Sequence, residues 1–152
     1  MSAKNLKALR FSTIVLLVLL FLQYEFGMAS NLSTLPTLPP IPNTLAGYST
    51  GLNTALAQAG VVTNIHAGLG SLLALAAIFV LVLCLRSGQR RVQVFGVLAF
   101  LTTVLAATTG TLFVMSGFQN DNLSHGMATN FLLAYTGYFL VLYCLKSAQP
   151  AS

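Results

Sequence analysis

Charged residues are scarce in this 152-residue chain, and acidic residues are the scarcest. Only 6% of the residues are charged, with seven Lys and Arg against two Asp and Glu, and tryptophan is absent. Soluble domains contain about 25% charged residues, so this composition excludes an ordinary water-soluble domain. Hydrophobic residues make up 56% of the chain. The composition therefore predicts an integral membrane protein of the cell or inner membrane, covered by lipid.

Several signatures of catalytic and nucleotide-binding sites are also missing. The chain has no glycine-rich phosphate loop and no CxxC pair. It has no Ser/His/Asp or Cys/His grouping at a recognisable spacing. The chain therefore has none of these common motifs from which an enzyme class is usually assigned.

Four segments are long and apolar enough to cross a bilayer. A spanning helix needs about 20 mostly apolar residues, because each residue rises about 1.5 Å through about 30 Å of hydrocarbon. The segments cover residues 11–28, 61–85, 92–116 and 124–145. Their length and continuity predict helices and argue against barrel strands. The predicted fold is an all-α, integral membrane four-helix bundle in a single domain, 1–152.

The basic residues indicate how the bundle is oriented. All seven flank the predicted spans on one side: Lys4, Lys7, Arg10, Arg86, Arg90, Arg91 and Lys146. The positive-inside rule makes that side cytoplasmic, which predicts an up-down-up-down order with both termini in the cytoplasm. The net charge of +5 is then a topology signal, and no nucleic-acid partner is expected. Cys84 and Cys144 fall on the reducing side, where we expect buried apolar thiols.

The first segment has a second interpretation. Its basic start, its apolar run and the triplet Gly27-Met28-Ala29 also fit a secretory signal with a small-x-small cleavage site. Cleavage would leave three spans and remove Glu25. Because the apolar stretch continues through Phe26, longer than many signals need, we expect the first helix to be retained.

The outer loop between the first two spans, about residues 29–60, divides into two parts. Its proline-rich core, Pro36 to Asn43, cannot form regular helix, because proline lacks the amide donor. Residues 50–59 are predicted to form a short amphipathic surface helix. The two later connections are short, so consecutive spans should be antiparallel neighbours.

The two histidines of the chain each lie near the outer end of a predicted span. Counting from Arg86 and Lys146, both His66 and His125 stand about 30 Å above an inner basic residue, so their heights agree. The second and fourth spans are expected at diagonal corners, about 12–14 Å apart. That gap suits a planar cofactor bound from both sides. We therefore predict that His66 and His125 are the axial ligands of a haem iron.

Small residues follow a helical stripe on the third span: Gly96, Ala99, Thr103, Ala106 or Ala107, and Gly110. Such a stripe leaves room for a flat macrocycle, and it equally permits close helix packing. For this span alone, packing is the favoured interpretation. A second function follows from the packing interpretation, namely a non-catalytic membrane subunit or scaffold that binds partner helices without a cofactor.

Glu25 is the acidic residue of the first predicted span. A carboxylate at that depth is costly unless it is protonated, hydrated or paired. It is a weak candidate for a catalytic group, and with His66 and His125 it would suit a transition-metal or proton site. The alternative is that the helix ends early and Glu25 lies in water. Both interpretations are open from the sequence.

Four spans with an outer histidine on the second and on the fourth resemble one half of haem A synthase, a family of cytochrome oxidase assembly enzymes. The likeness extends to LQYEFG at the end of the first span, IHAGLGSLLALAA on the second, TGTLFV on the third and LSHGMATNFLLA on the fourth. The resemblance implies that His66 and His125 bind a haem of b type or a related haem. It also implies respiratory-chain membrane proteins as partners.

The chain departs from this family at the second span. The family has a glutamate three residues before the histidine and an arginine directly after it, where this chain has Thr63 and Ala67. The paired outer-loop cysteines of many members are missing as well. The family's catalytic carboxylate is therefore not carried over. A haem-binding relative in electron transfer, haem handling or oxidase assembly is implied as strongly as an active oxidoreductase.

Overall fold

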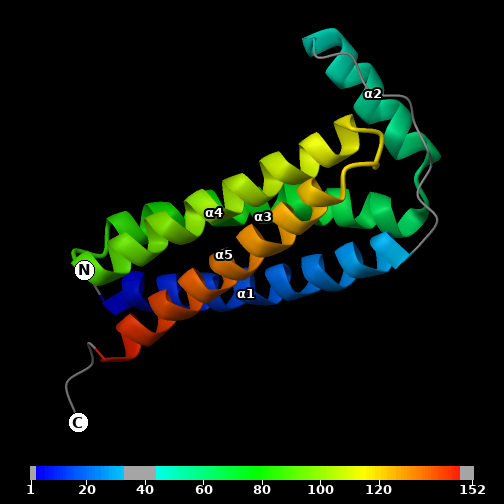
Figure 1. The fold of residues 1–152 in the computed structure, drawn as a ribbon. Coiled ribbons are helices and arrows are strands. Elements are labelled where there is room, and N and C mark those ends of the chain that lie inside the picture. Colours follow the sequence, from blue (N-terminus) through cyan, green and yellow to red (C-terminus); the bar gives the residue numbers. More distant parts are fainter. Residues whose placement is uncertain (1–2, 33–43, 148–152) are drawn as a thin grey trace.

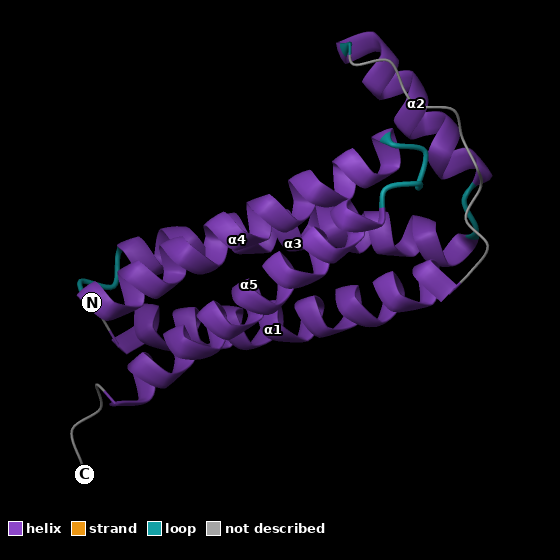
Figure 2. Ribbon diagram, viewed as in Figure 1, coloured by secondary structure: helices purple, strands orange, loops and turns teal. Residues whose placement is uncertain are grey.

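The computed structural model describes residues 3–32 and 44–147, and five helices account for most of them (Figures 1 and 2). The proline-rich core of the outer loop lies outside the described residues. The helices are α1 (Ala3–Leu32), α2 (Leu45–Gln58), α3 (Val61–Leu85), α4 (Arg90–Met115) and α5 (Asp121–Ser147).

Four of the described helices are long and apolar enough to cross a membrane: Lys4–Leu32, Val61–Leu85, Arg90–Met115 and Asp121–Leu145. The chain is therefore a multi-pass integral membrane protein. The predicted bounds of α3 agree with the structure, whereas α1 extends beyond 11–28 at both ends. The N-terminal extension follows from helix propensity, because the Ala, Lys and Leu residues that begin α1 favour helix.

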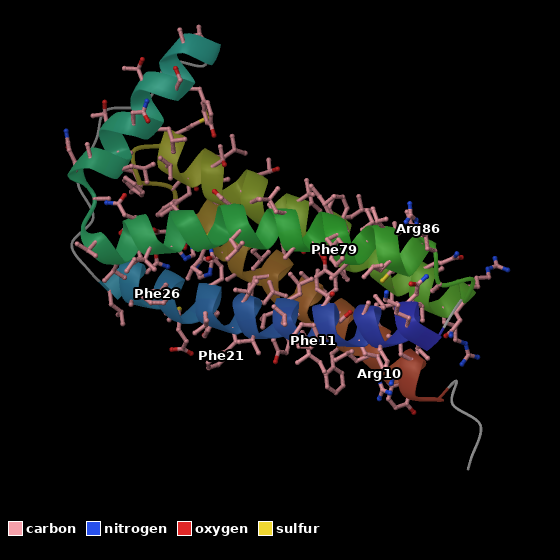
Figure 3. The ribbon with its side chains drawn as sticks, turned by 180° about the vertical axis from the view of Figure 1, so that it is seen from behind. Arg10, Phe11, Phe21, Phe26, Phe79 and Arg86 are labelled. Atoms are coloured by element: carbon pink, nitrogen blue, oxygen red, sulfur yellow. The ribbon has the colours of Figure 1, made fainter. Side chains whose placement is uncertain are left out.

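The four long helices form a ring. Both α1 and α4 pack against α3 and against α5, which places α3 and α5 at opposite corners. In the ribbon, α1 and α4 run in one direction and α3 and α5 in the other (Figure 1). Arg10 and Arg86 lie at the same end of the bundle (Figure 3). We call this the basic end, and the opposite end the loop end.

The apolar core lies mainly in the half of the bundle next to the basic end. Its fully buried side chains come from all four long helices: Leu9, Leu16, Ala77, Cys84, Val92, Ala99, Ala134, Tyr138, Val141 and Leu145. Cys84 and Cys144 are both buried, as predicted for apolar thiols. The half of the bundle next to the basic end therefore holds the four helices together through apolar packing. The loop end contains most of the interhelical polar contacts.

Small residues bring α4 very close to its neighbours. A Cβ atom on Gly96 would lie 2.7 Å from the Cβ and Sγ of Cys84 in α3. A Cβ atom on Gly137 of α5 would lie 2.8 Å from the Cβ of Ala99 in α4. The predicted small-residue stripe of the third span thus packs inside the bundle, which agrees with the packing interpretation.

The short helix α2 lies at the loop end and is angled away from the bundle (Figure 1). It begins earlier than the predicted residues 50–59. The reason is Thr44, whose side-chain oxygen accepts a hydrogen bond of 3.0 Å from the amide of Gly47 and so caps the first turn. Ala55 in α2 and Ala59 directly after it are buried, and α2 packs against α4.

Candidate functional site

His66 lies in the second turn of α3, near the loop end, and its ring is directed toward α1. Its Nδ1 atom lies 3.1 Å from the backbone oxygen of Gln23, and its Nε2 atom lies 3.2 Å from the side-chain Nε2 of Gln23. A Cβ atom on Gly27 would lie 2.9 Å from the ring carbon Cε1. The imidazole therefore occupies a notch that a glycine leaves open on α1.

The contacts with Gln23 assign a donor and an acceptor role to the two ring nitrogens as the side chains are placed. A side-chain amide nitrogen only donates hydrogen bonds, and a carbonyl oxygen only accepts them. Nε2 of His66 therefore accepts from Gln23, and Nδ1–H donates to the backbone oxygen. These roles correspond to a neutral imidazole, and both ring nitrogens contact α1.

A second polar contact between α1 and α3 lies closer to the helix ends. The hydroxyls of Ser30 and Thr63 are buried and 2.7 Å apart. The Thr63 hydroxyl thus bonds α3 to α1. No hydrogen bond between helices was predicted for Gln23, Ser30 or Thr63 from the sequence. Polar side chains inside an apolar run were the available signal, because such groups pair across membrane helices.

His125 lies in the second turn of α5, also near the loop end, and it is exposed. Nine residues separate it from Ala134, which is fully buried. At about 100° per residue the two side chains point to opposite sides of α5. His125 therefore faces away from the bundle, on a helix that stands diagonally across from α3. The structure brings both histidines to one end, but the two rings do not face each other.

This arrangement does not fit a haem held between the two histidines. An axial ligand needs a free ring nitrogen directed at the iron. Both nitrogens of His66 are engaged with Gln23, and the ring of His125 points outward. The bis-histidine site stays a prediction from the sequence.

Glu25 is exposed on α1. It follows the fully buried Leu16 by nine residues, so its carboxylate points away from the bundle. His66 contacts the opposite, inner side of the same helix. Among the residues that the structure describes, no three His, Cys, Asp or Glu side chains come together in a way that could hold a metal ion. Glu25, His66 and His125 thus remain apart.

A groove opens between α1 and α5. It is lined by Phe21, Tyr24, Phe131, Leu132 and Tyr135 and has a volume of about 200 Å³. Small-molecule pockets usually measure about 300–1,000 Å³, so this groove is small for a ligand of drug or cofactor size. The rings of Tyr24 and Phe131 stack across it at 5.6 Å.

The surface around this groove differs from the rest of the bundle. We call it the α1/α5 face, made of the exposed residues Phe21, Tyr24, Glu25, Leu132, Tyr135 and Phe139. Glu25 belongs to it because it lies one turn from Phe21 on the same side of α1. Six of the seven exposed Phe and Tyr side chains in the described part of the chain belong to α1 and α5, and only Phe79 belongs to α3. Phe21 and Phe79 are labelled in Figure 3.

Comparison with protein-family models, with curated proteins and with solved structures found no match to this chain. The resemblance to haem A synthase therefore stays a prediction that rests on the quoted sequence motifs.

Proposed function

We propose that this protein is a non-catalytic membrane subunit that packs its α1/α5 face against the helices of a partner membrane protein. In this proposal the chain crosses the bilayer four times in up-down-up-down order, with both termini cytoplasmic. The observation that supports the proposal is the concentration of exposed aromatic side chains and one carboxylate on a single face.

Aromatic side chains are enriched at the centres of protein interfaces. On the α1/α5 face they surround a groove that the bundle's own side chains leave unfilled. In contrast, Gly96 and Gly110 face Cys84 and Met127 inside the bundle. Bulky substitutions at these two glycines test the fold, and the α1/α5 face is the surface on which to test partner binding.

The proposed topology is tested with single cysteines in the two short turns. Asn120→Cys should react with a membrane-impermeant maleimide in intact cells, and Gln89→Cys only after lysis. Wild-type protein is the control, because Cys84 and Cys144 are buried. Labelling of Gln89→Cys in intact cells, with Asn120→Cys protected, would reverse the orientation.

Partner binding is tested by photo-crosslinking in the native membrane. A benzophenone amino acid replaces Phe21 or Tyr135, and the matched control replaces Phe79, which is 56% exposed against 53% for Phe21. The expected result is an adduct of defined mass from Phe21 and Tyr135 and none from Phe79. If all three positions give no protein adduct, the α1/α5 face is covered by lipid and the proposal fails.

Haem binding, in the service of electron transfer, haem handling or oxidase assembly, is the second candidate function. The observation that favours it is that His66 and His125 lie in the second turns of α3 and α5, at the same end of the bundle. Both rings would have to turn from the orientations described above before they could bind one iron atom. Protein purified from haem-replete cells should then show a sharp Soret band and low-spin spectra. His66→Ala and His125→Ala should each abolish them. A colourless preparation would argue against this function.

A further inference from the structure

Glu25 is the feature of the α1/α5 face that carries information about the partner. With α1 centred in the bilayer at Val18, the midpoint of Lys4–Leu32, Glu25 lies about 10 Å from the midplane. The hydrocarbon extends about 15 Å from the midplane, so the carboxylate lies inside it, near the boundary of the loop end. An ionisable side chain at such a depth normally marks a functional site, where it pairs with a specific group.

The part of the chain that the structure describes provides no cation for Glu25. Its Lys and Arg residues are confined to the basic end in the sequence, and Arg10 and Arg86 lie there in the structure. Gln23 is only two residues away but faces inward to His66. His125, on the neighbouring helix α5, is the exposed side chain at the loop end that can carry a positive charge.

Two contacts between α1 and α5 show that His125 and Glu25 are at different heights along the bundle. Asn31 donates a hydrogen bond of 3.3 Å to the hydroxyl of Ser124, and Tyr24 stacks on Phe131. In these antiparallel helices, Glu25 is therefore level with Asn130. His125 lies five residues closer to the loop end, which corresponds to about 7 Å along the helix axis.

The same difference in height between Glu25 and His125 applies to a second copy of this chain packed on the α1/α5 face. A two-fold axis along the membrane normal leaves each residue at its own height, so Glu25 of one copy meets the level of Asn130 in the other. Neither a lysine nor an arginine is available there. A homodimer would bury the carboxylate without a cation opposite it, which is strongly unfavourable.

We infer that the partner which covers the α1/α5 face is a different membrane protein, with a transmembrane helix that carries Lys or Arg opposite Glu25. This inference rests on the proposed function. The long stem of such a side chain packs along the aromatic groove, and its charged end reaches the carboxylate from the loop end. Arg adds bidentate geometry with the carboxylate. The partner helix is therefore expected to be apolar, with one basic residue about 10 Å from the midplane, toward the loop end of this bundle.

The experiment combines the photo-crosslinker at Phe21 with substitutions of Glu25 in the native membrane. Glu25→Lys places like charges together and should lower the adduct yield at least tenfold. Glu25→Gln, which keeps the shape and some hydrogen bonding, should lower it less. Gly68→Lys is the matched control for a new lysine in a span, because Gly68 is exposed on α3 and the Gly27–His66 and Gly70–Gln23 contacts place it level with Glu25; this variant should leave the yield unchanged. Helicity and membrane insertion are measured for each variant.

Once the adduct identifies the partner, the basic residue is exchanged for Glu and combined with Glu25→Lys. Recovery of the adduct in this charge-swapped pair supports the inference. A heteromeric adduct whose yield does not respond to Glu25→Lys overturns the inference while the proposed function stands. An adduct with the mass of two copies of this chain also overturns it. The absence of any protein adduct overturns both.

Discussion

The contact between Gly137 and Ala99 allows a sharp test of the packing that holds α4 to α5. Gly137→Ala adds one methyl group at a point where its Cβ would lie 2.8 Å from the Cβ and 3.1 Å from the Cα of Ala99. Ordinary contact begins at 3.4 Å. The Ala99 Cα belongs to the backbone, so the two helices must separate by about half an ångström or more, which sacrifices about a quarter to a half of each dispersion contact along the seam.

The matched control is Gly68→Ala on α3, where an added Cβ has no atom within 4 Å. Both substitutions gain the same intrinsic helix propensity, about 0.5–1 kcal/mol in water. The difference between the two variants therefore isolates the clash. Overpacking of this kind costs about 1–3 kcal/mol, so Gly137→Ala should be less stable than Gly68→Ala by about that free energy of unfolding.

Unfolding in mixed detergent micelles is measured through the reactivity of the thiols, since Cys84 and Cys144 are both buried in the folded protein. The double variant Gly137→Ala/Ala99→Gly removes the shorter of the two contacts and should recover part of the loss. Equal stability of Gly137→Ala and Gly68→Ala would refute the close approach of α4 and α5.

Two further predictions concern the loop end. Ser30→Ala removes one partner of the buried hydroxyl pair with Thr63 and should lower the free energy of unfolding by about 0.6–2 kcal/mol. A double-mutant cycle with Thr63→Val measures the coupling, and a coupling of zero would show that the contact contributes nothing. Thr44→Ala removes the N-cap of α2 and should destabilise this helix by about 1 kcal/mol. Hydrogen exchange of the α2 amides should then rise about fivefold while the four spans are unchanged. Unchanged exchange in α2 would contradict a stabilising cap.

The number and approximate extent of the spans could be predicted from the sequence. The bounds of α3 agree with the prediction because its apolar run is bordered by Gly60 and Arg86, and lipid imposes a minimum length on any such run. The start of α2 was missed because a cap depends on one hydroxyl, that of Thr44, and adds little to an apolar pattern. The extension of α1 was missed for the complementary reason, since hydropathy does not report helix formation outside the hydrocarbon.

The candidate site was predicted less well than the spans. Height along a helix follows from counting residues, and His66 and His125 do lie at one end of the bundle. Direction around a helix depends on which side meets a neighbour, and in a sequence that is apolar on all sides this is weakly encoded. His66 therefore turned out to face Gln23 on α1, and His125 to face outward.

Composition and run length alone determined that this chain is a helical, multi-pass membrane protein, because a backbone in hydrocarbon must satisfy its own hydrogen bonds within helices of sufficient length. Tertiary packing alone decided which side chains are inside. Close contacts at Gly96 and Gly137 fixed the rotation of α4 and α5, and the notch at Gly27 turned His66 toward α1. Those rotations left Glu25 and the aromatic side chains of α1 and α5 on one outer face, the surface from which the function is proposed.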